Sequence, residues 1–209
     1  METVWLNPRE RSVLPDPVVS DTEVGRVEAF YRSRPKLKPT PLHRIRGVAE
    51  ELALGEVLLK DESNRFGLNA FKILGVLYAF HRIMEARSSG GTPIVACASA
   101  GNHGRAVARA AREFGFAAKV YLPAGTVPAR VEDITGEGAD VVVTDFGYEG
   151  SVRQVARDAE REGWLIVSDT SWPGYNEVPR WIMAGYTWML TEAQAQWAPL
   201  PVPDAVIIQ

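Results

Sequence analysis

Short apolar runs alternate with helix-length amphipathic segments along most of this chain. The apolar runs cover residues 56–60, 93–98, 117–122, 139–144 and 164–168. The segments between them predict helices over residues 70–87, 102–114, 127–135 and 149–162. Because strands that are apolar throughout are buried on both faces, this alternation predicts a parallel sheet covered by helices. The predicted fold class is therefore α/β.

The segments that flank this alternation give weaker structural signals. The first twenty residues contain three prolines and little periodicity, so we expect an extended arm there. A helix should follow Ser20, because Ser20 and Glu23 have the spacing of a capping box. Another helix is predicted over residues 44–54, and Pro179 should lie in the first turn of a long helix. Residues 203–209 have the pattern of one more buried strand.

Charge and composition exclude several classes of function. The chain has 23 Lys plus Arg and 26 Asp plus Glu, which give a net charge of -3. It therefore lacks the basic excess that is typical of nucleic-acid-binding proteins. No apolar run approaches the ~20 residues that a membrane-spanning helix needs. With Cys97 as its single cysteine and three dispersed histidines, the chain is expected to hold no metal and to work in the cytoplasm.

The first candidate for chemistry is Lys72. It follows Ala70 and Phe71 and opens a predicted helix, where burial and the positive potential of the helix N-terminus both disfavour the ammonium form. A lysine in such a place is a candidate Schiff-base nucleophile. The alternative interpretation, a surface lysine whose stem lies along the core, is the more common one for a single lysine.

Two further candidates lie where predicted strands end. Residues 98–104, Ala-Ser-Ala-Gly-Asn-His-Gly, form a glycine-bearing strand-to-helix turn, whose backbone N–H groups would suit a carboxylate or a phosphate. Asp169 follows the strand predicted over 164–168, at the edge of the sheet where ligands of α/β proteins bind. An ordinary helix cap and an ordinary loop turn are the alternatives at these two places.

Taken together, these segments resemble the fold-type-II pyridoxal-phosphate enzymes, which have the tryptophan synthase beta-like fold. Within that group the sequence motifs are most similar to those of the diaminopropionate ammonia-lyase family. The resemblance rests on Pro39-Thr-Pro-Leu42, Lys60-Asp-Glu-Ser63, Arg65-Phe-Gly-Leu-Asn-Ala-Phe-Lys72, Gly101-Asn-His-Gly104 and Asp169-Thr-Ser-Trp-Pro-Gly-Tyr175. It implies a pyridoxal 5'-phosphate cofactor and elimination of the β-amino group of 2,3-diaminopropionate, which gives pyruvate and ammonia.

The resemblance also implies roles for individual residues. Lys72 would carry the cofactor, Asn102 would bind its phenolic oxygen, and Phe71 would lie beside it. Asp169 would act as acid or base at the substrate. The substrate carboxylate would be held by the turn residues Ser99, Ala100, Gly101 and His103.

Two departures from the family pattern shape the expectations. Ala100 stands where the lyases usually have an aspartate, which removes a candidate base and is similar to threonine dehydratases. The chain also ends before the glycine-rich phosphate-binding loop of the family, so we expect a truncated protein whose C-terminal part is missing. Residues 1–76 would be an arm and part of a large domain, 77–168 a small α/β domain, and 169–209 an incomplete return to the large domain.

Three functional hypotheses follow. The first is the ammonia-lyase, acting on a small amino acid either as a homodimer or with a complementing C-terminal half. The second is an inactive partner or remnant that serves as a binding module, so whether the chain is an enzyme stays open. The third is a deaminase of the threonine or serine dehydratase kind, which Ala100 favours.

Overall fold

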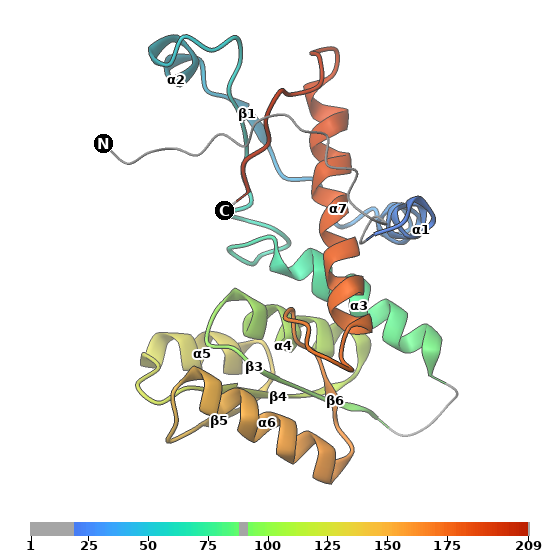
Figure 1. Ribbon diagram of the computed structural model, residues 1–209, viewed down its shortest axis with the longest axis vertical. Helices are drawn as coiled ribbons and strands as arrows, with labels where there is room; N and C mark the ends of the chain where they lie inside the picture. Colours follow the sequence, from blue (N-terminus) through green and yellow to red (C-terminus); the bar gives the residue numbers. More distant parts are fainter. Residues whose placement is uncertain (1–18, 88–91, 209) are drawn as a thin grey trace.

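The computed structural model describes residues 19–87 and 92–208. The arm expected over the first twenty residues lies outside the described part, apart from its last two positions. Figure 1 shows a sheet with its covering helices at one end of the molecule, and a long helix that runs from there towards the other end.

Four parallel strands form the main sheet, in the order β5-β4-β3-β6. They are β3 (Ile94–Ala98), β4 (Ala117–Leu122), β5 (Asp140–Val143) and β6 (Leu165–Ile166). Helices α4 (Asn102–Phe114) and α5 (Pro128–Gly136) cover one face, and α6 (Tyr148–Glu162) covers the other (Figure 1). The predicted parallel sheet, buried on both faces, is therefore confirmed.

Several helices begin or end where local sequence signals predict. The Ser20 hydroxyl accepts a hydrogen bond from the Glu23 backbone N–H at 3.2 Å, so it caps α1 (Asp21–Arg32) as the capping box predicts. Helix α4 ends at Gly115, whose φ of 73° is the left-handed conformation that glycine adopts without strain. Pro179 lies in the first turn of α7 (Glu177–Trp197), as expected.

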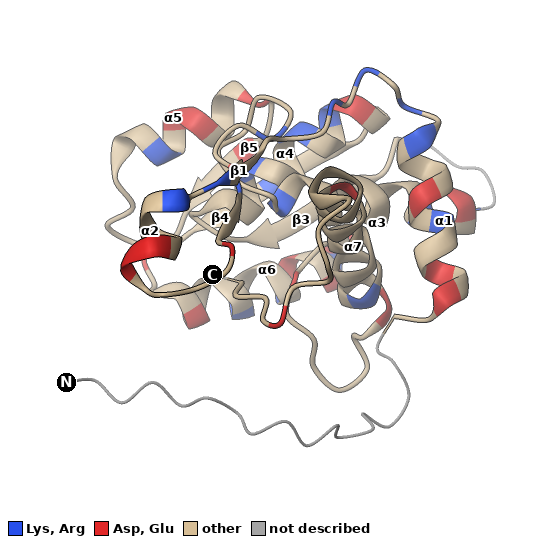
Figure 2. Cartoon of the chain, turned by 90° about the horizontal axis from the view of Figure 1, so that it is seen from above, with Lys and Arg blue, Asp and Glu red and all other residues tan. Residues whose placement is uncertain are grey.

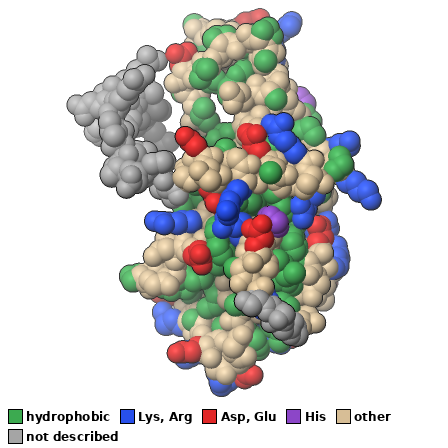
Figure 3. All heavy atoms as spheres, turned by 90° about the vertical axis from the view of Figure 1, so that its right-hand side faces the viewer, with side chains coloured by type: hydrophobic (Ala, Val, Ile, Leu, Met, Phe, Trp, Pro, Cys, Tyr) green, Lys and Arg blue, Asp and Glu red, His purple; other side chains and the backbone are tan. Residues whose placement is uncertain are grey.

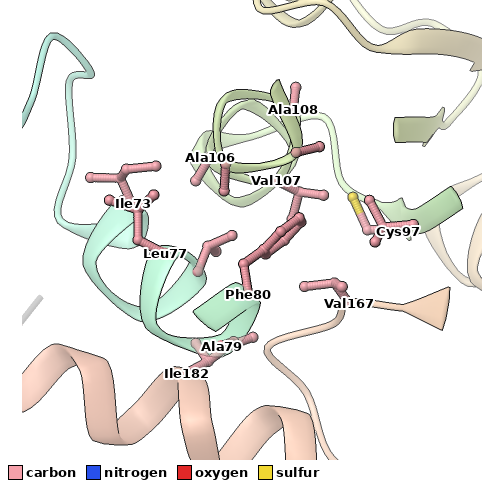
Figure 4. Close-up of a cluster of buried hydrophobic side chains, with 14 of the residues drawn as sticks. Ile73, Leu77, Ala79, Phe80, Cys97, Ala106, Val107, Ala108, Val167 and Ile182 are labelled. Atoms are coloured by element: carbon pink, nitrogen blue, oxygen red, sulfur yellow. The ribbon is translucent and has the colours of Figure 1, made fainter. Parts of the chain in front are cut away.

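The main core forms where α3 (Lys72–Ala86) packs between α4 and α7. In Figure 4, Phe80 points from α3 towards Val107 of α4, and Ile182 of α7 lies beneath Ala79. Gly75 and Gly185 allow the close crossing of α3 and α7, because a Cβ on Gly75 would lie 2.5 Å from the Ile182 carbonyl oxygen. This crossing fixes the N-terminus of α3, where Lys72 stands.

The predicted helix over 44–54 and the strand over 56–60 need correction. Residues Leu42–Arg44 form strand β1, and the helix is limited to α2 (Arg46–Glu51). Strand β2 (Leu58–Lys60) exists, but it pairs antiparallel with β1 in a separate two-stranded sheet. The physical reason is pairing: the short connection through α2 brings the chain straight back, so β2 hydrogen-bonds to β1 and not to the parallel sheet.

The strand expected over residues 203–209 is also wrong for the described residues 203–208, which form no strand. Strands are held by backbone hydrogen bonds to a neighbour, and in the described part of the chain no strand pairs with this segment. Its apolar side chains consequently lie in solvent, and Ile207 is 95% exposed. The proposed division into domains at residues 76 and 168 stays a prediction.

Figure 2 shows both acidic and basic segments among the helices, and in Figure 3 basic and acidic side chains lie beside one another on the face that is shown. Within residues 19–87 and 92–208, no helix has the length and apolar character needed to cross a membrane. In the same residues, no group of three or more His, Cys, Asp or Glu side chains is arranged to hold a metal ion.

Candidate active site

Lys72 and Asp169 meet at the junction between the helical layer and the sheet. The Lys72 Nζ atom donates a hydrogen bond to Asp169 Oδ2 at 2.7 Å. Lys72 is the first residue of α3, and Asp169 lies in the loop between β6 and α7. The two side chains are 31% and 25% exposed, so the pair is shielded and still accessible to a small molecule. The structure thus brings together the two residues to which the sequence assigned catalysis.

Aromatic rings border the Lys72 amine on the helical side. Its Nζ atom lies 5.5 Å from the ring centroid of Phe71 and 5.5 Å from that of Tyr186. The two rings meet edge to face, with centroids 5.0 Å apart. Their electron-rich faces attract a cation and so favour a position of the amine beside the two rings. Phe71 therefore lies beside Lys72, and Tyr186, on α7, is a neighbour that sequence reasoning missed.

His103 stands behind Asp169. Its Nδ1 atom lies 3.7 Å from Asp169 Oδ2, and its Nε2 atom lies 2.9 Å from the Val167 carbonyl oxygen. Burial lowers the pKa of His103 despite the opposing effect of Asp169, which favours the neutral imidazole with its proton on Nε2. The imidazole is 6% exposed, so it supports Asp169 from the protein interior, and a substrate contact by His103 stays a prediction.

The carboxyl group of Asp169 is held in its ionised form. Burial alone would raise the pKa of Asp169, but the neighbouring His103 and the Lys72 amine together lower it below its ordinary value. An ionised carboxylate in contact with the amine accepts a hydrogen bond from it and orients it. The arrangement therefore places the lysine amine and an ionised carboxylate in direct contact.

The turn between β3 and α4 forms the third part of the site. The Ser99 hydroxyl accepts a hydrogen bond from the Gly101 N–H at 3.3 Å, and no side chain caps α4 in the described structure. The first N–H groups of a helix lack partners within the helix, so here they are available to an anion. Asn102 is exposed, and Gly104 leaves no room for a Cβ, which would strike the Ser99 carbonyl group. The turn is shaped for close backbone approach, as the sequence predicts.

Two residues outside the predicted site hold its loops. Arg130, on α5, donates a hydrogen bond from Nη1 to the Ala100 carbonyl oxygen at 2.8 Å. The Tyr175 hydroxyl donates to the Ile166 carbonyl oxygen at 2.9 Å. No sequence signal marks Arg130, whereas Tyr175 belongs to the Asp169–Tyr175 motif and could have been singled out as a partner of the loop.

A buried ion network lies under the loop that leads to Lys72. Arg65 is 0% exposed, and its guanidinium contacts Glu62 and Glu192, with 2.8 Å from Nη1 to Glu192 Oε1 and 2.7 Å from Nη2 to Glu192 Oε2. Lys60 Nζ lies 3.0 Å from Glu192 Oε2 and donates to the Thr40 carbonyl oxygen at 2.8 Å. Three of the motifs behind the family resemblance therefore act as a support that joins this loop to α7. Sequence reasoning missed Glu192.

The three arginines on α4 are not free in solvent. Arg105, Arg109 and Arg112 share one helix face, which the sequence would assign to a solvated stripe. All three instead contact the buried carboxylate of Glu137, at the end of α5, and Arg109 also donates to the Phe66 carbonyl oxygen at 3.2 Å. The stripe thus connects α4 with α5 and with the loop before Lys72.

A separate surface cavity of about 390 Å³ lies away from this chemistry. Its lining includes Lys36, Lys38, Asp61, Ser63, Asn64 and Phe66. Neither Lys72 nor Asp169 contributes to it, so we assign the site from the Lys72–Asp169 contact and not from the size of a cavity.

Comparison with known proteins finds similar sequences. The sequence model of a family described as pyridoxal-phosphate dependent enzymes matches residues 34–209. The diaminopropionate ammonia-lyase of Salmonella typhimurium is 39% identical over 204 residues, which cover 88% of this chain and 50% of that protein. The chain thus spans about half the length of the curated relatives it matches.

Solved structures give the same result. The apo form of diaminopropionate ammonia lyase from Escherichia coli superposes with a TM-score of 0.82 at 36% identity, covering 90% of this chain and 56% of that one. The structure of the Escherichia coli enzyme in complex with an aminoacrylate-PLP azomethine reaction intermediate also has a TM-score of 0.82, at 37% identity, and covers 90% and 51%.

Proposed function

Because this chain belongs to the pyridoxal-phosphate dependent enzyme family and has its type-II fold, we propose that it provides the lysine-bearing part of a diaminopropionate ammonia-lyase. The proposed reaction removes the β-amino group of 2,3-diaminopropionate and yields pyruvate and ammonia. The observation that carries the proposal is the 2.7 Å contact between Lys72 Nζ and Asp169 Oδ2. It places the candidate amine directly against an ionised carboxylate in a partly shielded position.

The side chains present fit the cofactor. Lys72 offers a partly exposed primary amine for an aldehyde, and Phe71 supplies a ring beside that amine. Asn102, exposed at the start of α4, offers an amide donor for a phenolic oxygen. When bound, pyridoxal phosphate supplies an electron-withdrawing ring that acidifies the α-proton of an amino acid.

The chain's own residues would perform the remaining tasks. The turn from Ser99 to Gly101, with the first N–H groups of α4, would bind the substrate carboxylate. Asp169 would accept the proton that leaves Lys72 Nζ and return a proton to the departing amine. Lys72 would hold the ionised Asp169 carboxylate in place, and His103 would pack behind it.

A second candidate, deamination of threonine or serine, is supported by a specific observation at the same turn. Ala100 contributes a methyl group and no proton-transfer group, and its carbonyl oxygen is already engaged by Arg130. Hydroxyl elimination would then depend on Asp169 and Lys72 alone. The third hypothesis, a binding module without activity, remains the alternative for a chain that spans half the length of its relatives.

The proposed function is tested by adding pyridoxal phosphate to the purified chain, reducing with borohydride, and mapping the labelled peptides. We expect stoichiometric label on Lys72, loss of that label in Lys72→Ala, and no change in Lys119→Ala. Lys119 is a matched control, because it too is paired with an aspartate, Asp140. Scattered labelling of surface lysines would contradict the proposal and favour the binding module.

A labelled chain would then be assayed with both enantiomers of 2,3-diaminopropionate, and with threonine and serine, alone and mixed with a C-terminal half. Release of pyruvate from diaminopropionate supports the lyase, whereas turnover of threonine alone supports the dehydratase. Association as a homodimer or with a complementing half, and a cytoplasmic location, are part of the same proposal. Sedimentation with and without the added half distinguishes the two forms of association.

A further inference from the structure

The Tyr175 side chain binds two backbone groups at the outer edge of β6. Its hydroxyl donates to the Ile166 carbonyl oxygen at 2.9 Å and accepts from the Ser168 N–H at 2.9 Å. On the inner edge, the Val167 N–H donates to the Ala96 carbonyl oxygen of β3 at 2.9 Å. Since the polar groups of successive strand residues point to opposite edges, Tyr175 occupies the edge that β3 leaves open.

This hydroxyl reproduces the two hydrogen bonds that one residue makes in a parallel ladder. A residue on a neighbouring parallel strand donates its N–H to one carbonyl and accepts from the N–H two residues further along. The Tyr175 oxygen makes the same two bonds, to Ile166 and Ser168. β6 is an edge strand of the sheet and has only two residues, so this single oxygen extends its pairing to Ser168, the residue before Asp169.

The Tyr175 side chain is itself held firmly. Its ring stacks on Trp172 with centroids 4.1 Å apart, and the backbones of the two residues exchange hydrogen bonds of 3.2 and 2.8 Å. Burial raises the pKa of Tyr175, so the hydroxyl keeps the proton that it donates to Ile166. From the other side, His103 binds the Val167 carbonyl oxygen at 2.9 Å. The segment before Asp169 is thus fixed on both sides.

We propose that Tyr175 is a positioning residue for Asp169: its hydroxyl fixes the backbone of residues 166–168 and so holds the Asp169 carboxylate against Lys72 Nζ. The inference deepens the proposed function, and rests on it in that Asp169 is the proton acceptor there. The geometry that carries it, however, involves only side chains and backbone groups of this chain and no cofactor. Without the hydroxyl, the Ile166 carbonyl and the Ser168 N–H lose their partner, and the backbone directly before Asp169 gains freedom.

The test is a carboxyl ¹³C NMR titration of the purified chain without cofactor, with the Asp169 signal assigned by its loss in Asp169→Asn. In the wild-type chain the Asp169 midpoint should lie below 3.8, because His103 and Lys72 outweigh the effect of burial. In Tyr175→Phe the midpoint should rise towards 3.8, because the carboxylate leaves its partners. Tyr121→Phe is the matched control: its hydroxyl donates to Asp158 Oδ2 at 2.8 Å, so the Asp169 midpoint should stay in place.

An unchanged Asp169 midpoint in folded Tyr175→Phe overturns the proposal. Should Tyr175→Phe not fold by circular dichroism, Trp172→Leu replaces it, because this variant removes the stacked ring and keeps the hydroxyl. A smaller rise of the midpoint is then expected, and no rise overturns the proposal. The titration needs no cofactor, so failure of Lys72 labelling, which would contradict the proposed function, leaves this result interpretable.

Discussion

Lys72 Nζ and Asp169 Oδ2 are 2.7 Å apart, although 97 residues separate them in the chain. The contact joins the first turn of α3 to the loop that leaves the edge strand β6. Each partner is positioned by its own element: the α3–α7 crossing places the lysine, and the held segment before Asp169 places the carboxylate. The lysine and the carboxylate therefore meet only when both layers of the molecule are assembled.

Replacing the carboxylate of Asp169 should remove the proton acceptor and leave the fold in place. In any preparation that turns over 2,3-diaminopropionate, Asp169→Asn should lower the rate of pyruvate release by about 10²- to 10⁴-fold, the usual contribution of general acid–base catalysis. Asp140→Asn is the control, because Asp140 is also paired with a lysine but lies on β5. Equal rates for wild type and Asp169→Asn would show that another group moves the proton.

Removing the guanidinium of Arg65 should destabilise the chain strongly. Arg65→Ala leaves Glu62 and Glu192 buried without their main counter-ion, which costs about 3–5 kcal/mol of unfolding free energy. Arg32→Ala, which removes an exposed ion pair with Glu28, should change it by less than about 0.5 kcal/mol. Urea denaturation measures both variants, and similar midpoints for the two would refute a structural role for the network.

Adding a methyl group at Gly75 should force α3 and α7 apart. In Gly75→Ala the new Cβ would lie 2.5 Å from the Ile182 carbonyl oxygen, and overpacking of this kind destabilises by about 1–3 kcal/mol. Gly25→Ala, in α1, has open space around its new Cβ and should stabilise the chain by about 0.5–1 kcal/mol. Thermal melts should therefore shift in opposite directions, and a shift in the same direction would contradict the close crossing.

Acid should destabilise the chain in two steps. Burial lowers the pKa of His103, so the unfolded chain binds more protons below 6.5 and the free energy of unfolding falls as pH decreases through that region. The lowered pKa values of Asp169, Glu137 and Glu192 add a second loss near and below 4.5, because their stabilising ionised forms disappear.

Urea midpoints measured between pH 8 and pH 3 check this sign. His103→Gln should weaken the upper step, and it should also reduce the Asp169 contribution to the lower one, because His103 helps to lower the pKa of Asp169. His81, whose pKa burial also lowers, contributes to the upper step, so His103→Gln with His81→Gln should weaken it further. A chain whose stability rises on acidification below 6.5 would contradict the assignment.

Local signals in the sequence were sufficient for most of the secondary structure. The apolar runs predicted β3, β4 and β5. The capping residue Ser20 placed the start of α1, and Gly115 placed the end of α4. These features depend on backbone conformation and short-range burial, which the neighbouring residues already determine. The prediction went wrong at residues 44–54, at the placement of β2 and at residues 203–208, where pairing with another segment decides.

The candidate residues were also visible in the sequence, because lysine, aspartate and a glycine-bearing turn followed predicted strands or opened predicted helices. The sequence could not supply their partners. Glu192 contacts Arg65, which lies 127 positions away in the chain. The Tyr175 hydroxyl makes the two hydrogen bonds that a residue of a neighbouring strand would make at the edge of β6. Neither contact leaves a local pattern.

The sequence by itself determined the α/β class and the family resemblance, and it singled out Lys72 as the candidate amine. Only the tertiary structure decided that Lys72 faces a carboxylate, that the arginines of α4 converge on Glu137, and that Tyr175 fixes the approach to Asp169. The physical reason is that hydrogen bonds and ion pairs act over a few ångströms in space. Which side chains come within that distance depends on how the layers pack, and not on their spacing along the chain.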